Sequence, residues 1–160
     1  MKLIVADACS LILLAKVMLL QQTLEIIEIV ITPEVNEECT KDLRFPDAVL
    51  LEEYITQHKI KVMEVRNKGN EMIRLGKGEL SVIQLYKEQK AYALLTDDGK
   101  TIKYCNIKGY QYTTTPRVLL SLYKKNKIKK NEALVALKKL ETAGRYAKDV
   151  IASIMLQLGE

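Results

Sequence analysis

Five acidic residues of the chain are spaced so that they could form one metal-binding site. Asp7 directly follows an apolar run, and Asp97 and Asp98 directly follow another. Glu38 lies one turn beyond Val35 in an expected helix, and Glu79 opens a later expected helix. Converging carboxylates repel one another, and proton uptake or a bound cation relieves that repulsion. Because an all-oxygen set of ligands favours hard cations, these residues predict a site for Mg²⁺ or Mn²⁺ rather than zinc.

Each of these acids also has a simpler interpretation. An aspartate just before a helix is a common N-cap, and for Asp97 or Asp98 taken alone this is the better interpretation. Glu79 in a first helical turn could only complement the helix dipole, and Glu38 could be an exposed charge. Asp7 is the hardest to explain in this way, because a buried strand leads straight into it. No simple interpretation explains why the acids would converge.

The expected secondary structure alternates between strands and helices. Apolar and alternating runs predict strands at residues 2–5, 28–31, 59–65, 92–95 and 110–112. Helical spacing and Thr-Pro starts predict helices that begin near residues 10 and 79 and a helix that ends near residue 106. They also predict helices at 33–40, 46–57, 115–123, 130–142 and 147–158. The glycine-containing stretch 67–78 is the least regular. The alternation predicts an α/β fold with a parallel sheet, in one domain over residues 1–160.

The positions of the acids relative to these strands give them a common location. In an open parallel sheet, ligands bind beyond the carboxyl ends of the strands, where the strand order reverses. Asp7 follows the first expected strand, and Asp97 and Asp98 follow the fourth. We therefore expect the two acidic turns to share one site.

Composition limits the class of protein. The 160 residues are 48% hydrophobic and 28% charged, as in soluble globular domains. Three widely spaced cysteines predict reduced thiols in a cytoplasmic protein rather than a disulfide framework. Asp7 and Lys16 interrupt the apolar N-terminal segment, which argues against a signal peptide and against a membrane span.

The basic charge of the chain favours contact with a polyanion. The formal net charge is +5 at pH 7. A cluster of lysines near an expected turn between two C-terminal helices is the candidate grip on a polyanionic substrate. An equally good alternative is a solvated basic turn that complements a helix C-terminus. The cluster comprises Lys124, Lys125, Lys127, Lys129 and Lys130.

Five segments of the chain, in this order, resemble the motifs of the PIN domain family, which includes the VapC-type toxins. They are V-A-D-A-C-S-L-I-L-L-A-K (5–16), I-T-P-E-V-N-E-E-C (31–39), L-G-K-G-E-L-S-V-I (75–83), L-L-T-D-D-G-K (94–100) and T-P-R-V-L-L (115–120). Each motif is weak alone, and the set is fairly specific and covers nearly the whole chain. The resemblance implies a Rossmann-like five-stranded parallel sheet in the order 3-2-1-4-5.

The resemblance also implies an activity and a set of site residues. The activity is hydrolysis of single-stranded RNA with Mg²⁺ or Mn²⁺. The implied catalytic residues are Asp7, Glu38, Glu79 and Asp98. The implied metal ligands are Asp7, Glu79, Asp98 and Asp97, with Glu38 contributing through water. The implied supporting residues are Ser10, Thr96 and Thr115. Two positions depart from the family pattern. Cys9 lies where the family usually has serine or asparagine, and Thr114 lies where glycine is common.

The resemblance also implies binding partners, and the sequence leaves alternative functions open. RNA and an antitoxin protein are the implied partners, and apolar helices at residues 11–20 and 151–158 predict a homodimer. The main alternative is a non-catalytic PIN-like module that binds RNA or protein. A phosphatase of similar topology would need an aspartate at position 9, where this chain has Cys9. A structure-specific DNA nuclease would need further DNA-threading elements.

Overall fold

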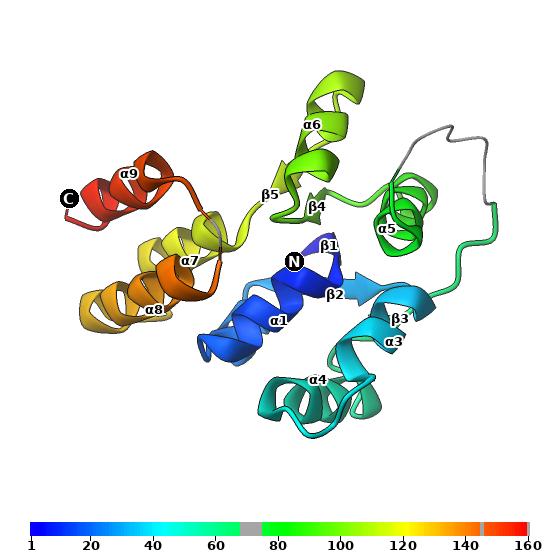
Figure 1. Cartoon of the computed structure of the whole chain (residues 1–160), viewed down its shortest axis with the longest axis horizontal. Coiled ribbons are helices and arrows are strands. Elements are labelled where there is room, and N and C mark those ends of the chain that lie inside the picture. Colours follow the sequence, from blue (N-terminus) through cyan, green and yellow to red (C-terminus); the bar gives the residue numbers. More distant parts are fainter. Residues whose placement is uncertain (68–74, 145, 160) are drawn as a thin grey trace.

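Five short strands form a sheet through the centre of the protein (Figure 1). The computed structural model describes residues 1–67, 75–144 and 146–159. The strands lie in the order β3-β2-β1-β4-β5, and every neighbouring pair is parallel. Their bounds are β1 Lys2–Ala6, β2 Ile27–Ile31, β3 Lys61–Val62, β4 Ala93–Leu95 and β5 Tyr112–Thr113. The predicted α/β class and the predicted strand order 3-2-1-4-5 are both confirmed.

Helices connect the strands and complete the C-terminal part of the described chain. Their bounds are α1 Ala8–Lys16, α2 Leu20–Leu24, α3 Pro33–Thr40, α4 Pro46–Thr56, α5 Lys77–Gln89, α6 Gly99–Lys108, α7 Thr115–Lys124, α8 Lys130–Ala143 and α9 Lys148–Leu158. Besides shifts of one or two residues at the ends of several elements, such as β5, there are two larger differences from the prediction. The short helix α2 was not predicted, and β3 has two residues instead of the seven expected at 59–65. Both residues of β3 are exposed, which agrees with its place at the sheet edge.

The helices lie on both sides of the sheet (Figure 1). Helix α1 packs against α3, α4 and α7, while α5 packs against β1 and β4. The C-terminal helices α7, α8 and α9 pack against one another. The irregular stretch predicted at 67–78 lies partly outside the described residues, which resume at Leu75.

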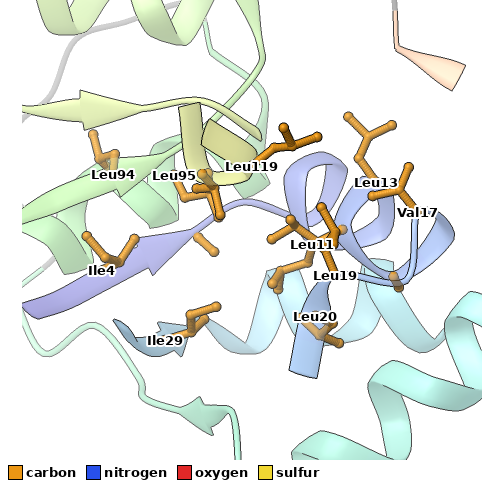
Figure 2. Close-up of a cluster of buried hydrophobic side chains, with 14 of the residues drawn as sticks. Ile4, Leu11, Leu13, Val17, Leu19, Leu20, Ile29, Leu94, Leu95 and Leu119 are labelled. Atoms are coloured by element: carbon orange, nitrogen blue, oxygen red, sulfur yellow. The ribbon is translucent and has the colours of Figure 1, made fainter. Parts of the chain in front are cut away.

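One buried apolar cluster joins the strands to these helices. Figure 2 shows side chains of the central strands next to side chains of the helical segments that follow them. The labelled strand residues are Ile4, Ile29, Leu94 and Leu95, and the labelled helical residues include Leu11, Leu20 and Leu119. Because β1 and β4 are buried on both faces, their ends are held firmly relative to each other. These ends carry the acidic turns.

Within the described ranges, no helix has the length and apolar character needed to cross a membrane. All three cysteines are free thiols, as predicted from their number and spacing.

Candidate functional site

A pocket of about 490 Å³ lies beyond the carboxyl ends of β1 and β4. These strands are neighbours at the point where the strand order reverses, which is where open parallel sheets bind ligands. Five carboxylates line the pocket, and the described residues around it include no lysine, arginine or histidine. The five are Asp7, Glu38, Glu79, Asp97 and Asp98. The structure therefore brings together all the acids singled out in the sequence.

Asp7 is the most buried acid of the pocket, with 6% of its surface exposed. It is the N-cap of α1, and its Oδ1 accepts a hydrogen bond of 2.8 Å from the Ser10 backbone N–H. Burial raises the pKa of Asp7 from 3.8 to about 6, and the nearby Asp97 adds a smaller increase. Hydrogen bonds from Thr96 and Ser10 oppose this shift. Ionised Asp7 therefore lowers the stability of the fold unless a cation lies next to it.

Asp97 is held by four hydrogen bonds. Its Oδ2 accepts from the hydroxyls of Ser10, at 2.6 Å, and Thr115, at 2.5 Å. Its Oδ1 accepts from the Thr115 backbone N–H, at 3.0 Å, and from the Tyr146 hydroxyl, at 2.8 Å. Four donors around one carboxylate fix its orientation.

Asp98 has a different local role from its neighbour. It is the N-cap of α6, and its Oδ2 accepts hydrogen bonds from the backbone N–H and the hydroxyl of Thr101. Its own backbone N–H donates to the Thr96 hydroxyl at 3.2 Å. The N-cap interpretation thus describes Asp98, while Asp97 points among Ser10, Thr115 and Tyr146. Both carboxylates still line the pocket.

Glu38 and Glu79 approach the pocket from α3 and α5. The two helices are joined by a buried hydrogen bond of 2.7 Å between the Thr32 and Ser81 hydroxyls. Ser81 donates its proton to the Gly78 carbonyl at 2.7 Å, so Thr32 is the donor in the bond to Ser81. Thr32 is also the N-cap of α3. This chain of hydrogen bonds sets the start of α5, with Glu79, against the helix that carries Glu38.

Replacing Ser81 by alanine should therefore loosen the contact between α3 and α5. The change removes the acceptor of the buried Thr32 hydroxyl and the donor to Gly78, so we expect the free energy of unfolding to fall by about 1–3 kcal/mol. Chemical denaturation measures this change. Ser153→Ala, on an exposed position of α9, is the control and should change stability little. Equal effects of the two substitutions would show that the buried contact contributes nothing.

The pocket also contains a thiol, which belongs to Cys9. Burial is the main cause that raises the Cys9 pKa from 9.0 to about 11, and Asp7, Asp97, Asp98 and Glu38 raise it further. The thiol stays protonated at neutral pH, so the structure does not favour Cys9 as a nucleophile.

This pKa predicts slow alkylation of Cys9 at pH 7–8. The thiolate fraction is about 100-fold lower than for a thiol of pKa 9, and the higher intrinsic nucleophilicity recovers about tenfold of that. Iodoacetamide should thus modify Cys9 about tenfold more slowly than a small model thiol, with a rate that rises up to about pH 11. Peptide mass spectrometry identifies the modified cysteine. A rate that levels off below pH 9 would contradict the raised pKa.

The predicted lysine cluster lies away from this pocket. Helix α7 begins at the site with Thr115 and ends at Lys124, about 15 Å along the helix axis. Lys125 and Lys127 line another pocket, and Lys127 forms an ion pair with Glu25. The cluster is therefore not part of the acidic site. Two other exposed lysines, Lys77 and Lys100, are adjacent in the chain to residues that line the acidic pocket.

The acids fit a divalent cation in their chemistry, since all are oxygen donors and none of the described pocket residues supplies a positive charge. As placed, however, no three acidic, cysteine or histidine side chains in the described ranges could share one ion. Glu79 accounts for part of this, because its Oε2 occupies the space where a Cβ at Gly76 would be. Its carboxylate is thus turned back over the start of α5.

Tyr146 is the pocket residue that sequence reasoning missed. It is one of eight tyrosines, and its position just after two C-terminal helices meet has no feature of a known motif. Its hydroxyl nevertheless donates to Asp97, and its ring lines the pocket. Only the three-dimensional packing of α8 and α9 shows this contact.

Comparisons with known proteins agree with the fold. A protein-family model described as "DUF3368: PIN domain" matches residues 3–160. No curated protein matches the chain. Among solved structures, the chain is similar to a PilT N-terminus domain protein from the hyperthermophilic archaeon Sulfolobus solfataricus P2. The TM-score is 0.56 and the identity 17%, over 76% of this chain and 93% of that one. At this level of identity the likeness concerns the fold alone.

Proposed function

The chain belongs to the PIN domain family, whose members are generally nucleases, and we propose that it is a Mg²⁺- or Mn²⁺-dependent ribonuclease acting on single-stranded RNA. One observation carries the proposal. Five carboxylates line a single pocket at the switch point of the sheet, and no positive side chain lies among the described residues around it. Ionising Asp7 here costs stability, because burial is the main cause that raises its pKa and the charge of Asp97 adds a smaller increase, and a bound cation would offset that cost.

PIN domains generally use divalent metal ions, and four acids of the pocket would hold one here. They are Asp7, Glu79, Asp97 and Asp98. A bound Mg²⁺ or Mn²⁺ would lower the pKa of water and stabilise negative charge on the phosphoryl oxygens. Hydrogen bonds hold the Asp7 and Asp97 carboxylates and the helix cap holds Asp98, so binding one ion would require carboxylates of the pocket to draw together.

The reaction would be in-line hydrolysis of a phosphodiester. Water attacks phosphorus, the bond to the 3′ oxygen breaks, and the products carry a 5′-phosphate and a 3′-hydroxyl. Lys77 and Lys100, next to the pocket in α5 and α6, are better placed to hold the flanking phosphates than the lysines beyond α7. The net charge of +5 favours the approach of RNA.

A cleavage assay tests the function. Wild type should cut an end-labelled single-stranded RNA only when Mg²⁺ or Mn²⁺ is present, and the products should have the ends described above. Glu79→Gln, prepared in the same way and shown to be folded, controls for contaminating nucleases. If that variant and Asp7→Asn cut RNA as fast as wild type, the mechanism is wrong.

A non-catalytic module that binds RNA or protein is the second candidate. It is favoured by the placement of the acids, since no three of them in the described ranges could share one ion. RNA binding without cleavage, unchanged by added Mn²⁺, would support it.

PIN domains sometimes pair with antitoxins, and our proposal includes a toxin role for this chain. Growth arrest on expression that depends on an intact Asp7 would support that role. Homodimerisation through exposed apolar residues of the segments 11–20 and 151–158, such as Met18 and Leu156, stays a prediction for solution measurements.

A further inference from the structure

The C-terminal helices supply most of the hydrogen bonds that orient Asp97. Thr115, the first residue of α7, donates two of the four bonds. Tyr146, between α8 and α9, donates a third, and only the Ser10 bond comes from another part of the fold. Asp97 therefore connects the acidic pocket to α7, α8 and α9, which pack together.

The local structure around Tyr146 directs its ring into the pocket. Gly144 ends α8, and a Cβ at that position would overlap the Tyr146 ring and press on the Leu140 carbonyl at 3.0 Å. The absence of a side chain at Gly144 thus leaves the space that the ring occupies. The ring is partly buried, and its hydroxyl reaches Asp97 Oδ1 at 2.8 Å.

The Tyr146 hydroxyl is the donor in its hydrogen bond with Asp97 Oδ1. A protonated phenol is a poor ligand for a hard cation, whereas a carboxylate is a good one. The two side chains therefore have different roles: the Asp97 carboxylate lines the pocket, and the Tyr146 hydroxyl holds it in place.

We propose that Tyr146 is a positioning residue, whose hydroxyl fixes the Asp97 carboxylate for binding of a divalent cation in the acidic pocket. This inference rests on the proposed metal-dependent function. Groups that orient metal ligands typically change metal affinity or activity 10- to 100-fold when they are removed. The position of Tyr146 also means that the contact between α8 and α9 affects the metal site.

The test is Mn²⁺ binding to the RNA-free, metal-free chain, measured by calorimetry. Tyr146→Phe removes only the hydroxyl and should weaken Mn²⁺ binding 10- to 100-fold, while the protein stays folded with a lower thermal stability. Tyr123→Phe, which removes the hydroxyl of another partly buried tyrosine near the C-terminal end of α7, is the matched control and should bind like wild type. In cleavage assays, excess Mn²⁺ should restore much of the activity of Tyr146→Phe, because the defect is in affinity.

A second variant disturbs the same contact from the backbone side. Gly144→Ala should displace the ring and weaken Mn²⁺ binding in a similar way. If both changes act through one hydrogen bond, the double variant should bind Mn²⁺ about as weakly as Tyr146→Phe alone. Independent, multiplying losses would show that Gly144 acts by another route, and would contradict the link between its side-chain space and Asp97.

The outcomes separate this inference from the proposed function. Wild type and Tyr146→Phe binding Mn²⁺ equally well would overturn the role of Tyr146 and leave the metal site standing. Equal weakening in Tyr146→Phe and Tyr123→Phe would also overturn it, by showing a general effect of lost hydroxyls. Absence of Mn²⁺ binding by wild type, with and without RNA, would overturn the metal-dependent function and the inference with it.

Discussion

Replacing Asp7 by asparagine should abolish RNA cleavage and also make the metal-free protein more stable at neutral pH. The substitution keeps the shape of the side chain and an oxygen that can accept from the Ser10 backbone N–H. It removes a charge that the fold keeps at a cost, because burial raises the Asp7 pKa from 3.8 to about 6. A site that destabilises its own fold is expected where function requires it.

The direction of the pH effect follows from the shifted pKa. Between pH 3.8 and about 6 the folded chain binds more protons at Asp7 than the unfolded chain does. The contribution of Asp7 to stability is therefore complete below pH 3.8 and is lost as pH rises through about 6. A shift of this size corresponds to about 3 kcal/mol. After allowance for weaker hydrogen bonds to the amide, Asp7→Asn should gain about 1–3 kcal/mol at pH 7–8.

Denaturant unfolding at pH 4 and pH 8, with a chelator present, measures this prediction. Wild type should lose stability relative to Asp7→Asn between the two values, and the exposed Asp149→Asn is the control. We expect Asp7→Asn to cut RNA at least about 10³-fold more slowly, because it loses several kcal/mol of stabilisation of the reacting phosphate. An Asp7→Asn protein that is less stable at pH 8 would contradict the account of its burial.

Asp97→Asn should also abolish cleavage, but here the protein should become less stable. The Asp97 carboxylate accepts four hydrogen bonds, two on each oxygen. An amide has one acceptor oxygen, so its NH₂ group would face two of these donors. Since hydrogen bonds to a charged group each contribute about 1.5–3 kcal/mol, we expect a loss of about 2–4 kcal/mol.

The same unfolding measurements at pH 7.5 test this prediction, again beside Asp149→Asn. The two neighbouring acids should respond to the same chemical change with opposite signs. Buried Asp7 has too few donors to offset its burial, whereas Asp97 has a full set. If Asp97→Asn were as stable as wild type, the four hydrogen bonds would not act on the carboxylate as the structure indicates.

Much of the fold could be predicted from the sequence, because its signals are local. The apolar runs that became β1, β2 and β4 are short, buried and flanked by helical patterns. The Thr-Pro starts of α3 and α7 are helix signals in themselves. The prediction was weaker where local signals are few. The edge strand β3 is exposed and short, so the alternation of polar and apolar residues at 59–65 overestimated its length.

The candidate site could be predicted in its members and less well in its geometry. Asp7 and the Asp97–Asp98 pair follow strands that become neighbours, so their proximity follows from the order of the sheet. Which aspartate caps α6 and which faces inward depends on one turn, and adjacent residues of the same type give no signal for it. The contact of Tyr146 depends on how α8 and α9 pack, far from Asp97 in the chain.

The most direct test of the central claim is calorimetric titration of Mn²⁺ into the chelator-treated chain at pH 7.5. The claim is that the carboxylates beyond β1 and β4 form one cation site. Wild type and Asp149→Asn should bind Mn²⁺ alike, while Asp7→Asn and Asp97→Asn, both shown to be folded, should lose that binding. Binding that persists unchanged in both pocket variants, or no binding by wild type even with RNA present, would contradict the claim.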